Sequence, residues 1–155
     1  MDIRIDPLEM ENILHITRPL EQSMGLGNDY FSYSKEKEEL RQGKGRNALT
    51  FLMQKEGMAE EEALKCLKEK IVSLEETHHA AFEVSMKNGV LSPELRRYIL
   101  FLRMAGGGVH VFHGTAGRYK PSPDMKADTA PVFIRHALRL ALASVALLLF
   151  ILVLK

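Results

Sequence analysis

The sequence predicts an all-α protein of 155 residues. Apolar side chains recur at steps of three and four along most of the chain, which is the period of one face of a helix. No segment alternates apolar and polar residues as a half-buried strand does. With 46% hydrophobic and 26% charged residues, the composition is that of a folded chain, and disorder is excluded for most of it.

The first third of the chain is expected to hold three helices. Residues 8–22 and 29–41 are the two longer candidates, and Gly43-Lys44-Gly45 forms a loop before a short helix at 47–55. The opening residues mix acidic and apolar side chains, so the N-terminus is neither a signal peptide nor a basic transit peptide.

The clearest helical pattern covers residues 59–87. Its apolar stripe advances in alternating steps of three and four through Leu64, Leu67, Ile71, Leu74, His78, Ala81 and Ser85. Asn88-Gly89 is the expected end of this helix. Ser92 is then expected to cap the next helix, with Pro93 in its first turn.

The C-terminal part differs in composition from the rest. Residues 140–154 are fifteen consecutive residues without a charge, and several prolines precede them. The chain therefore divides into a partial catalytic domain at 1–123, a linker at 124–132 and an apolar C-terminal helix at 133–155.

The apolar C-terminal helix is expected to be a tail anchor. Residues 137–154, with Arg139 extending its side chain toward the headgroups, reach about 27 Å, close to a thin membrane. The basic residues on its N-terminal side would keep the bulk of the protein cytosolic. A buried helix, or sequence appended by faulty gene prediction, is the alternative. The expected location is the cytoplasm or the cytosolic face of a membrane.

Charge and cysteine content narrow the function classes. The chain has 21 basic and 20 acidic residues, a net charge of +1, so no global field favours nucleic acid. The one cysteine, Cys66, cannot form an internal disulfide, which indicates a reducing compartment.

Three oxygen-bearing side chains recur at four-residue steps: Asn28, Ser32 and Glu36. On a helix each step advances about 6 Å with a small rotation, so the three share one face. An amide oxygen, a hydroxyl and one carboxylate form a hard oxygen site of low charge. Such a site suits Mg²⁺, which keeps water and takes further ligands from a substrate phosphate.

This spacing also has structural explanations. Asn28 and Asp29 are good helix N-caps, Ser32 is a common surface residue, and Glu36 belongs to a run of alternating charges. Other metal patterns are incomplete. Glu76 and His79 have a di-iron spacing without a second copy, and the pair His110 and His113 lacks further zinc ligands.

The stretch NDYFSYSKE at 28–36 resembles the second metal-binding motif of class I terpene synthases, N-D-x-x-S-x-x-K-E, with every defined position present. The family also has an Arg-Tyr pair downstream, and Arg118-Tyr119 stands here, followed by Lys120-Pro121 as in fungal members. The chain looks most like fungal cyclases, including the cyclase domains of fungal chimeric enzymes. The resemblance covers roughly residues 1–123.

The resemblance implies a function. Class I terpene synthases ionise an allylic prenyl diphosphate with Mg²⁺ and cyclise the carbocation in an apolar pocket. By this similarity Asn28, Ser32 and Glu36 would bind Mg²⁺. Arg118, Tyr119 and Lys35 would contact the diphosphate of farnesyl or geranylgeranyl diphosphate.

Departures from the family pattern also occur. Phe112 stands where fungal members often have tryptophan. Gly106-Gly107-Gly108 lies where the family often has a glycine pair, and is expected to let the helix approach substrate rather than to break it.

The family's aspartate-rich first metal motif and its upstream diphosphate-sensing arginine are absent from these 155 residues. The expectation is therefore the C-terminal half of a terpene synthase, from a truncated gene model or a pseudogene-like remnant. Alone, it should bind metal weakly and turn over little. The alternative is a non-catalytic, tail-anchored helical protein that keeps the metal motif as a relic.

Overall fold

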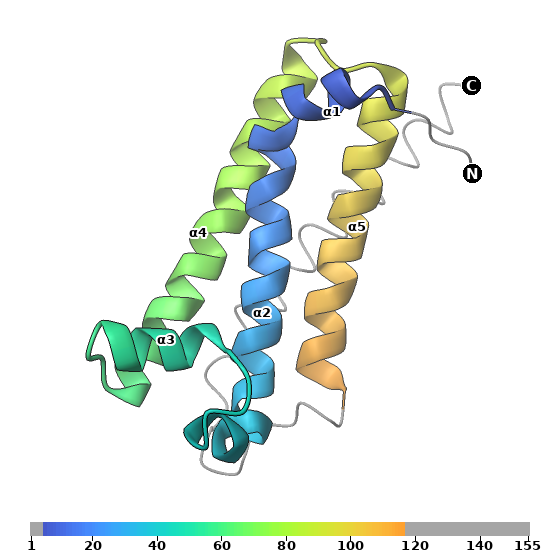
Figure 1. Ribbon diagram of the computed structural model, residues 1–155. Helices are drawn as coiled ribbons and strands as arrows, with labels where there is room; N and C mark the ends of the chain where they lie inside the picture. The colour runs from blue at the N-terminus through green and yellow to red at the C-terminus, as the bar shows by residue number, and fades with distance from the viewer. Residues whose placement is uncertain (1–4, 117–155) are drawn as a thin grey trace.

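The computed structural model describes residues 5–116, and this part of the chain is built from helices with no strand. The helices are α1 (Pro7–Asn12), α2 (Leu14–Arg41), α3 (Ala48–Lys55), α4 (Glu60–Lys87) and α5 (Pro93–Thr115). The all-α prediction is confirmed. In Figure 1 the long helix α2 lies between α4 and α5, and α3 crosses the end where α4 begins.

Several predictions fall on residues outside the described range. Arg118, Tyr119, the linker at 124–132 and the apolar helix at 133–155 all lie there, so the domain boundaries and the membrane anchor stay predictions. Between residues 5 and 116, no helix is both long and apolar enough to cross a membrane.

The predicted boundary between the first two helices was wrong. Rather than two helices at 8–22 and 29–41, the chain breaks at Ile13, and α2 then runs without interruption to Arg41. Gly25 and Gly27 favour a break in an isolated peptide. Packing of α2 against α4 and α5 along its length overrides that local preference.

The other helix ends follow local signals that the sequence carries. Asn47 caps α3 by accepting a hydrogen bond from the Leu49 amide, and Ser92 caps α5 in the same way from Leu95. Gly89, just after α4, has a positive φ of 68°, which glycine adopts without strain.

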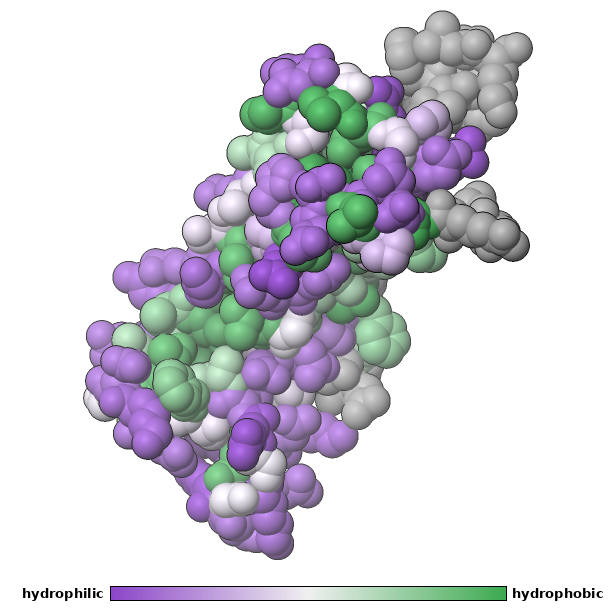
Figure 2. Space-filling view, turned by 45° about the horizontal axis from the view of Figure 1, so that its top comes forward, coloured by the Kyte–Doolittle hydropathy of each residue, from purple (hydrophilic) through white to green (hydrophobic). Residues whose placement is uncertain are grey.

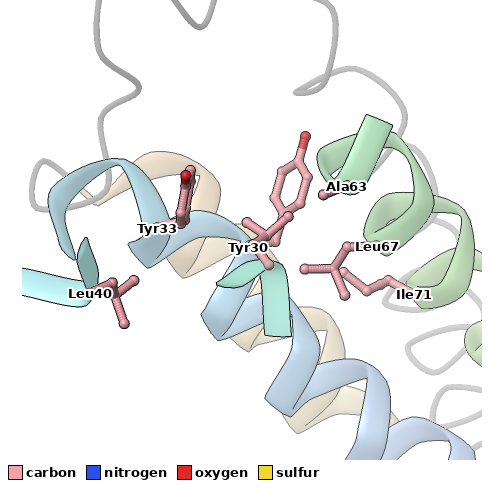
Figure 3. Packing of buried hydrophobic residues seen from close by; sticks show 7 residues of the cluster. Tyr30, Tyr33, Leu40, Ala63, Leu67 and Ile71 are labelled. Atoms are coloured by element: carbon pink, nitrogen blue, oxygen red, sulfur yellow. The ribbon is translucent and has the colours of Figure 1, made fainter. Parts of the chain in front are cut away.

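The interior contains two apolar clusters at opposite ends of α2. The first joins α2, α3 and α4 and is shown in Figure 3; its buried members are Tyr30, Tyr33, Leu40, Leu49, Ala63, Leu67 and Ile71. The second joins α5, the far end of α4 and the start of α2; its buried members are Ile13, Ile16, Phe82, Leu91, Leu95, Ile99 and Leu100. The helices are thus held together mainly by apolar burial at two levels.

Between the two clusters lies a layer of buried polar side chains, here called the polar layer: Ser23, Glu75, His78, Arg103 and His110. The ring Nδ1 of His78 lies 2.6 Å from the carbonyl oxygen of Ile16, and the Arg103 guanidinium lies 4.1 Å from the centre of the Phe82 ring. His78 is therefore the packed histidine that its place in the stripe predicts.

The glycine run in α5 does not break the helix. Gly106 and Gly107 are buried and Gly108 is exposed. A Cβ at Gly106 would lie 3.0 Å from Leu20 Cδ1, so the absence of a side chain there lets α5 approach α2 closely. The surface seen in Figure 2 is mostly hydrophilic, with hydrophobic patches between the hydrophilic areas.

Candidate functional site

The predicted metal-binding residues lie on α2, and the continuous helix keeps them in successive turns. Ser32 Oγ donates a hydrogen bond to Glu36 Oε2 at 2.9 Å, so two of the three predicted oxygen ligands are in contact with each other. Ser32 is only 3% exposed, Glu36 is half-buried, and Asn28 is exposed one turn earlier. A hydroxyl and a carboxylate gathered in this way match the donor set that a hard divalent cation prefers.

The structural explanations for this spacing are wrong for two of the three residues. Asn28 is not a helix cap, because α2 begins fourteen positions earlier at Leu14. Ser32 is not a surface residue, because it is buried.

Asp29, the second residue of the motif, has a role that the sequence did not reveal. Its Oδ2 accepts a hydrogen bond from the Ala48 amide at 2.8 Å, and its carbonyl oxygen accepts one from Asn47 Nδ2 at 2.9 Å. Asp29 therefore fixes the N-terminus of α3 to α2. Burial raises the pKa of the Asp29 carboxyl, the Ala48 amide opposes that rise, and the charge of Glu36 adds to it.

The two lysines that follow Ser32, Lys35 and Lys37, lie in different surroundings. Lys35 is exposed beside Glu36. Lys37 instead turns to the first apolar cluster, where its Nζ lies 2.7 Å from Glu60 and 5.8 Å from the centre of the Tyr33 ring. Lys37 thus links α2 to the start of α4, which leaves Lys35 as the lysine of this turn that faces solvent.

The two histidines of α5, His110 and His113, contact different elements. Nε2 of His110 lies 2.7 Å from Glu75 Oε1 on α4, and the His113 ring packs near Phe31 with the ring centres 5.8 Å apart. Across residues 5–116, no three histidine, cysteine or acidic side chains are placed to hold a metal together. Glu75 could not be paired with His110 from the sequence, because no local pattern links residues so far apart.

The di-iron pattern is likewise without support. Glu76 and His79 are exposed on α4, and His79 Nδ1 lies 3.5 Å from an Arg103 nitrogen.

Comparison with known proteins identifies the family of this helical chain. The family model "Terpene synthase family 2, C-terminal metal binding" matches residues 1–77, which contain all of α2 and α3. The chain is 31% identical over 123 residues to preaspterpenacid I synthase of Aspergillus terreus, covering 76% of this chain and 16% of that protein. It is 34% identical over 139 residues to preasperterpenoid A synthase of Talaromyces verruculosus, covering 83% of this chain and 18% of that protein.

The chain belongs to the class I terpene synthases, and it corresponds to the C-terminal, metal-binding half of their catalytic domain. It spans less than a fifth of the length of these curated relatives. No solved structure matches the chain significantly. These findings support the terpene synthase family for this chain.

Proposed function

We propose that this chain supplies one half of a Mg²⁺-dependent site that ionises an allylic prenyl diphosphate and cyclises the resulting carbocation. The observation that carries the proposal is the Ser32–Glu36 hydrogen bond on the same run of α2 as Asn28. The names of the two relatives, both terpenoid synthases, support the same class of reaction.

The donor set fits Mg²⁺ by its chemistry. Asn28 and Ser32 offer neutral oxygens, and Glu36 offers the one negative charge. When bound, Mg²⁺ would supply positive charge to the leaving diphosphate. Glu36 would accept the hydrogen bond that the Ser32 hydroxyl donates, which leaves the lone pairs of the Ser32 oxygen available to the cation. The low charge of this set leaves coordination positions for phosphate oxygens and water.

Ionisation breaks the bond between the allylic carbon and the diphosphate oxygen, and the electron pair leaves with the diphosphate. Donors aimed at that oxygen stabilise the charge where it develops. We propose Arg118 and Tyr119 as such donors and Lys35, which is exposed beside Glu36, as a third contact. The substrate class is farnesyl or geranylgeranyl diphosphate.

The α2 ligands need carboxylates facing them from another segment. A site with one carboxylate holds Mg²⁺ weakly, and these 155 residues contain no adjacent pair of aspartates such as an aspartate-rich motif of the form D-D-x-x-D has. We therefore propose that efficient turnover requires such a motif, supplied upstream on the same polypeptide or by a separate chain.

The proposal is tested by binding and by turnover. Mn²⁺, as a paramagnetic substitute for Mg²⁺, is titrated with inorganic diphosphate into the purified chain and followed by electron paramagnetic resonance. Glu36→Gln is expected to weaken Mn²⁺ binding by about tenfold or more, because it removes the one charge of the set. Glu39→Gln removes an exposed charge one turn away on α2 and is expected to bind as the parent does.

Turnover is measured as diphosphate release from farnesyl and geranylgeranyl diphosphates with Mg²⁺. The chain is assayed alone and with the part of the Aspergillus terreus relative that the chain does not cover. Release that depends on Mg²⁺ and is lost in Glu36→Gln supports the proposal. Equal Mn²⁺ affinity in the parent and in Glu36→Gln would contradict it.

A further inference from the structure

The outer face of α5 carries apolar side chains that are exposed. α5 lies at one edge of the described bundle and packs against α2 with its opposite face (Figure 1). Phe101 is 66% exposed, Met104 43% and Val111 37%. Together with Gly108 these residues advance in steps of three, four and three, which is the spacing of a seam that packs against another segment. These four residues are here called the outer stripe of α5.

The outer stripe has no charged side chain within it. Every exposed residue of α5 from Phe101 to Thr115 is uncharged, whereas the exposed residues of α4 include several glutamates and lysines. Isolated apolar residues are ordinary on a protein surface, but a contiguous apolar stripe marks a surface that another segment covers. A Cβ at Gly108 would meet nothing within 4 Å, so a covering segment can approach the backbone of α5 at the middle of the stripe.

The size of the outer stripe limits what can cover it. A fully buried aromatic side chain removes about 150–250 Å² from water, so three partly exposed side chains offer roughly 300 Å². A stable complex of two separate proteins buries roughly 800 Å² on each partner. The stripe is therefore small for a stable dimer, and a segment tethered to the same chain is favoured over a second copy.

The same chain carries a segment of matching chemistry. Residues 140–154, outside the described range, are an uncharged run, and residues 116–139 join this run to the end of α5. A connection of that length reaches about 80 Å when extended. α5 itself is about 35 Å long, so the run can reach every part of the outer stripe. A tether that spans its two sites gives an effective concentration in the millimolar range, which no second copy reaches in a dilute solution.

We propose that residues 140–154 bind to the outer stripe of α5 when no membrane is present. The contact removes apolar surface of both partners from water at the same time, which is its driving force. The membrane anchor expected from the sequence uses the same residues, so the outer stripe and a lipid bilayer compete for them. The contact is separate from the metal site, and its test does not depend on the proposed function.

A single tryptophan reports whether the outer stripe is covered, because the chain has no tryptophan of its own. Phe101→Trp places the reporter in the stripe. Phe51→Trp is the matched control, since Phe51 is 55% exposed and lies on α3. The full chain is purified without detergent, and circular dichroism checks that each variant is folded. Phe101→Trp is expected to emit at a shorter wavelength than Phe51→Trp and to be quenched severalfold less by acrylamide.

Charges in the run should uncover the stripe. Leu148→Lys combined with Phe150→Lys makes burial of the run against α5 unfavourable. In the Phe101→Trp background this pair is expected to raise acrylamide quenching to the level of Phe51→Trp. Ala127→Lys combined with Thr129→Lys adds the same charge to the connection and is expected to leave quenching unchanged.

Each other outcome overturns the proposal. Equal quenching of Phe101→Trp and Phe51→Trp does so, and so does protection that survives the two lysines in the run. Protection that is lost on dilution assigns the stripe to a second copy, because a contact within one chain does not depend on concentration. Protection that requires the part of the Aspergillus terreus relative that the chain does not cover assigns the stripe to that part.

A chain that stays in solution only with detergent or lipid vesicles also overturns the proposal, because a covered run needs neither. The metal site is judged separately by Mn²⁺ affinity, so failure of this contact and failure of the proposed function are told apart.

Discussion

At the scale of single residues, the stretch at 28–36 combines the predicted metal ligands with residues that have a structural role. Ser32 and Glu36 are in contact with each other. Asp29, in the same stretch of α2, instead accepts a hydrogen bond from the start of α3. The four-residue spacing of the ligands could be predicted from the sequence, because an α-helix fixes it. The role of Asp29 could not, because its partner Ala48 follows a loop of unpredictable path.

Asp29 gives a prediction that separates hydrogen bonding from charge. Asp29→Ala removes the acceptor of the Ala48 amide and is expected to cost about 1–2 kcal/mol of unfolding free energy. Asp29→Asn keeps an acceptor and is expected to be much less destabilising. Urea denaturation followed by circular dichroism measures both. Equal losses for the two variants would contradict the assignment.

The pH dependence at this residue has a defined sign. Burial raises the pKa of Asp29 in the folded chain, so the folded state binds a proton more readily than the unfolded state. The contribution of Asp29 to the free energy of unfolding is fully present below the pKa that it has in the unfolded chain. It is lost as the pH rises through the pKa that it has in the folded chain. Relative to Asp29→Asn, the parent should therefore lose stability as pH rises from about 3.8 toward neutrality.

At the scale of helices, local signals fix ends and tertiary packing fixes continuity. Ser92 caps its helix as predicted, because a cap acts within three residues of itself, and Asn47 caps α3 one position before the helix begins. The continuity of α2 through Gly25 and Gly27 was not predictable. It depends on packing against helices that come much later in the chain.

Two glycines of α5 offer a matched pair of substitutions. Gly108→Ala enters open space on a helix and is expected to stabilise the chain by about 0.5–1 kcal/mol. At Gly106→Ala the methyl group meets Leu20, a fully buried side chain, so the propensity gain should be offset and the variant destabilised by about 1 kcal/mol. Urea midpoints compare the two, and equal midpoints would contradict the close approach of α5 to α2.

At the scale of the whole molecule, the polar layer makes folding sensitive to pH. Burial lowers the pKa of His78 below its ordinary value of 6.5, partly opposed by its hydrogen bond to Ile16. The folded state then binds fewer protons than the unfolded state at this site. Stability is therefore expected to fall as pH drops through about 6.5.

His78→Gln tests this dependence. The variant is expected to lose part of the decline in unfolding free energy between about pH 7.5 and pH 5.5, because its amide does not titrate. His15→Gln alters an exposed histidine of α2 and should keep the parent slope. An identical slope in the parent and in His78→Gln would assign the pH dependence to other residues.

The two apolar clusters are built from different sets of helices. α3 belongs to the first cluster and α5 to the second, while α2 and α4 contribute to both. Changes in the two clusters are therefore expected to combine additively, since no residue belongs to both clusters. A substitution around Leu49 should therefore leave the packing around Ile99 unchanged, so the two ends of the bundle can tolerate sequence change independently of each other.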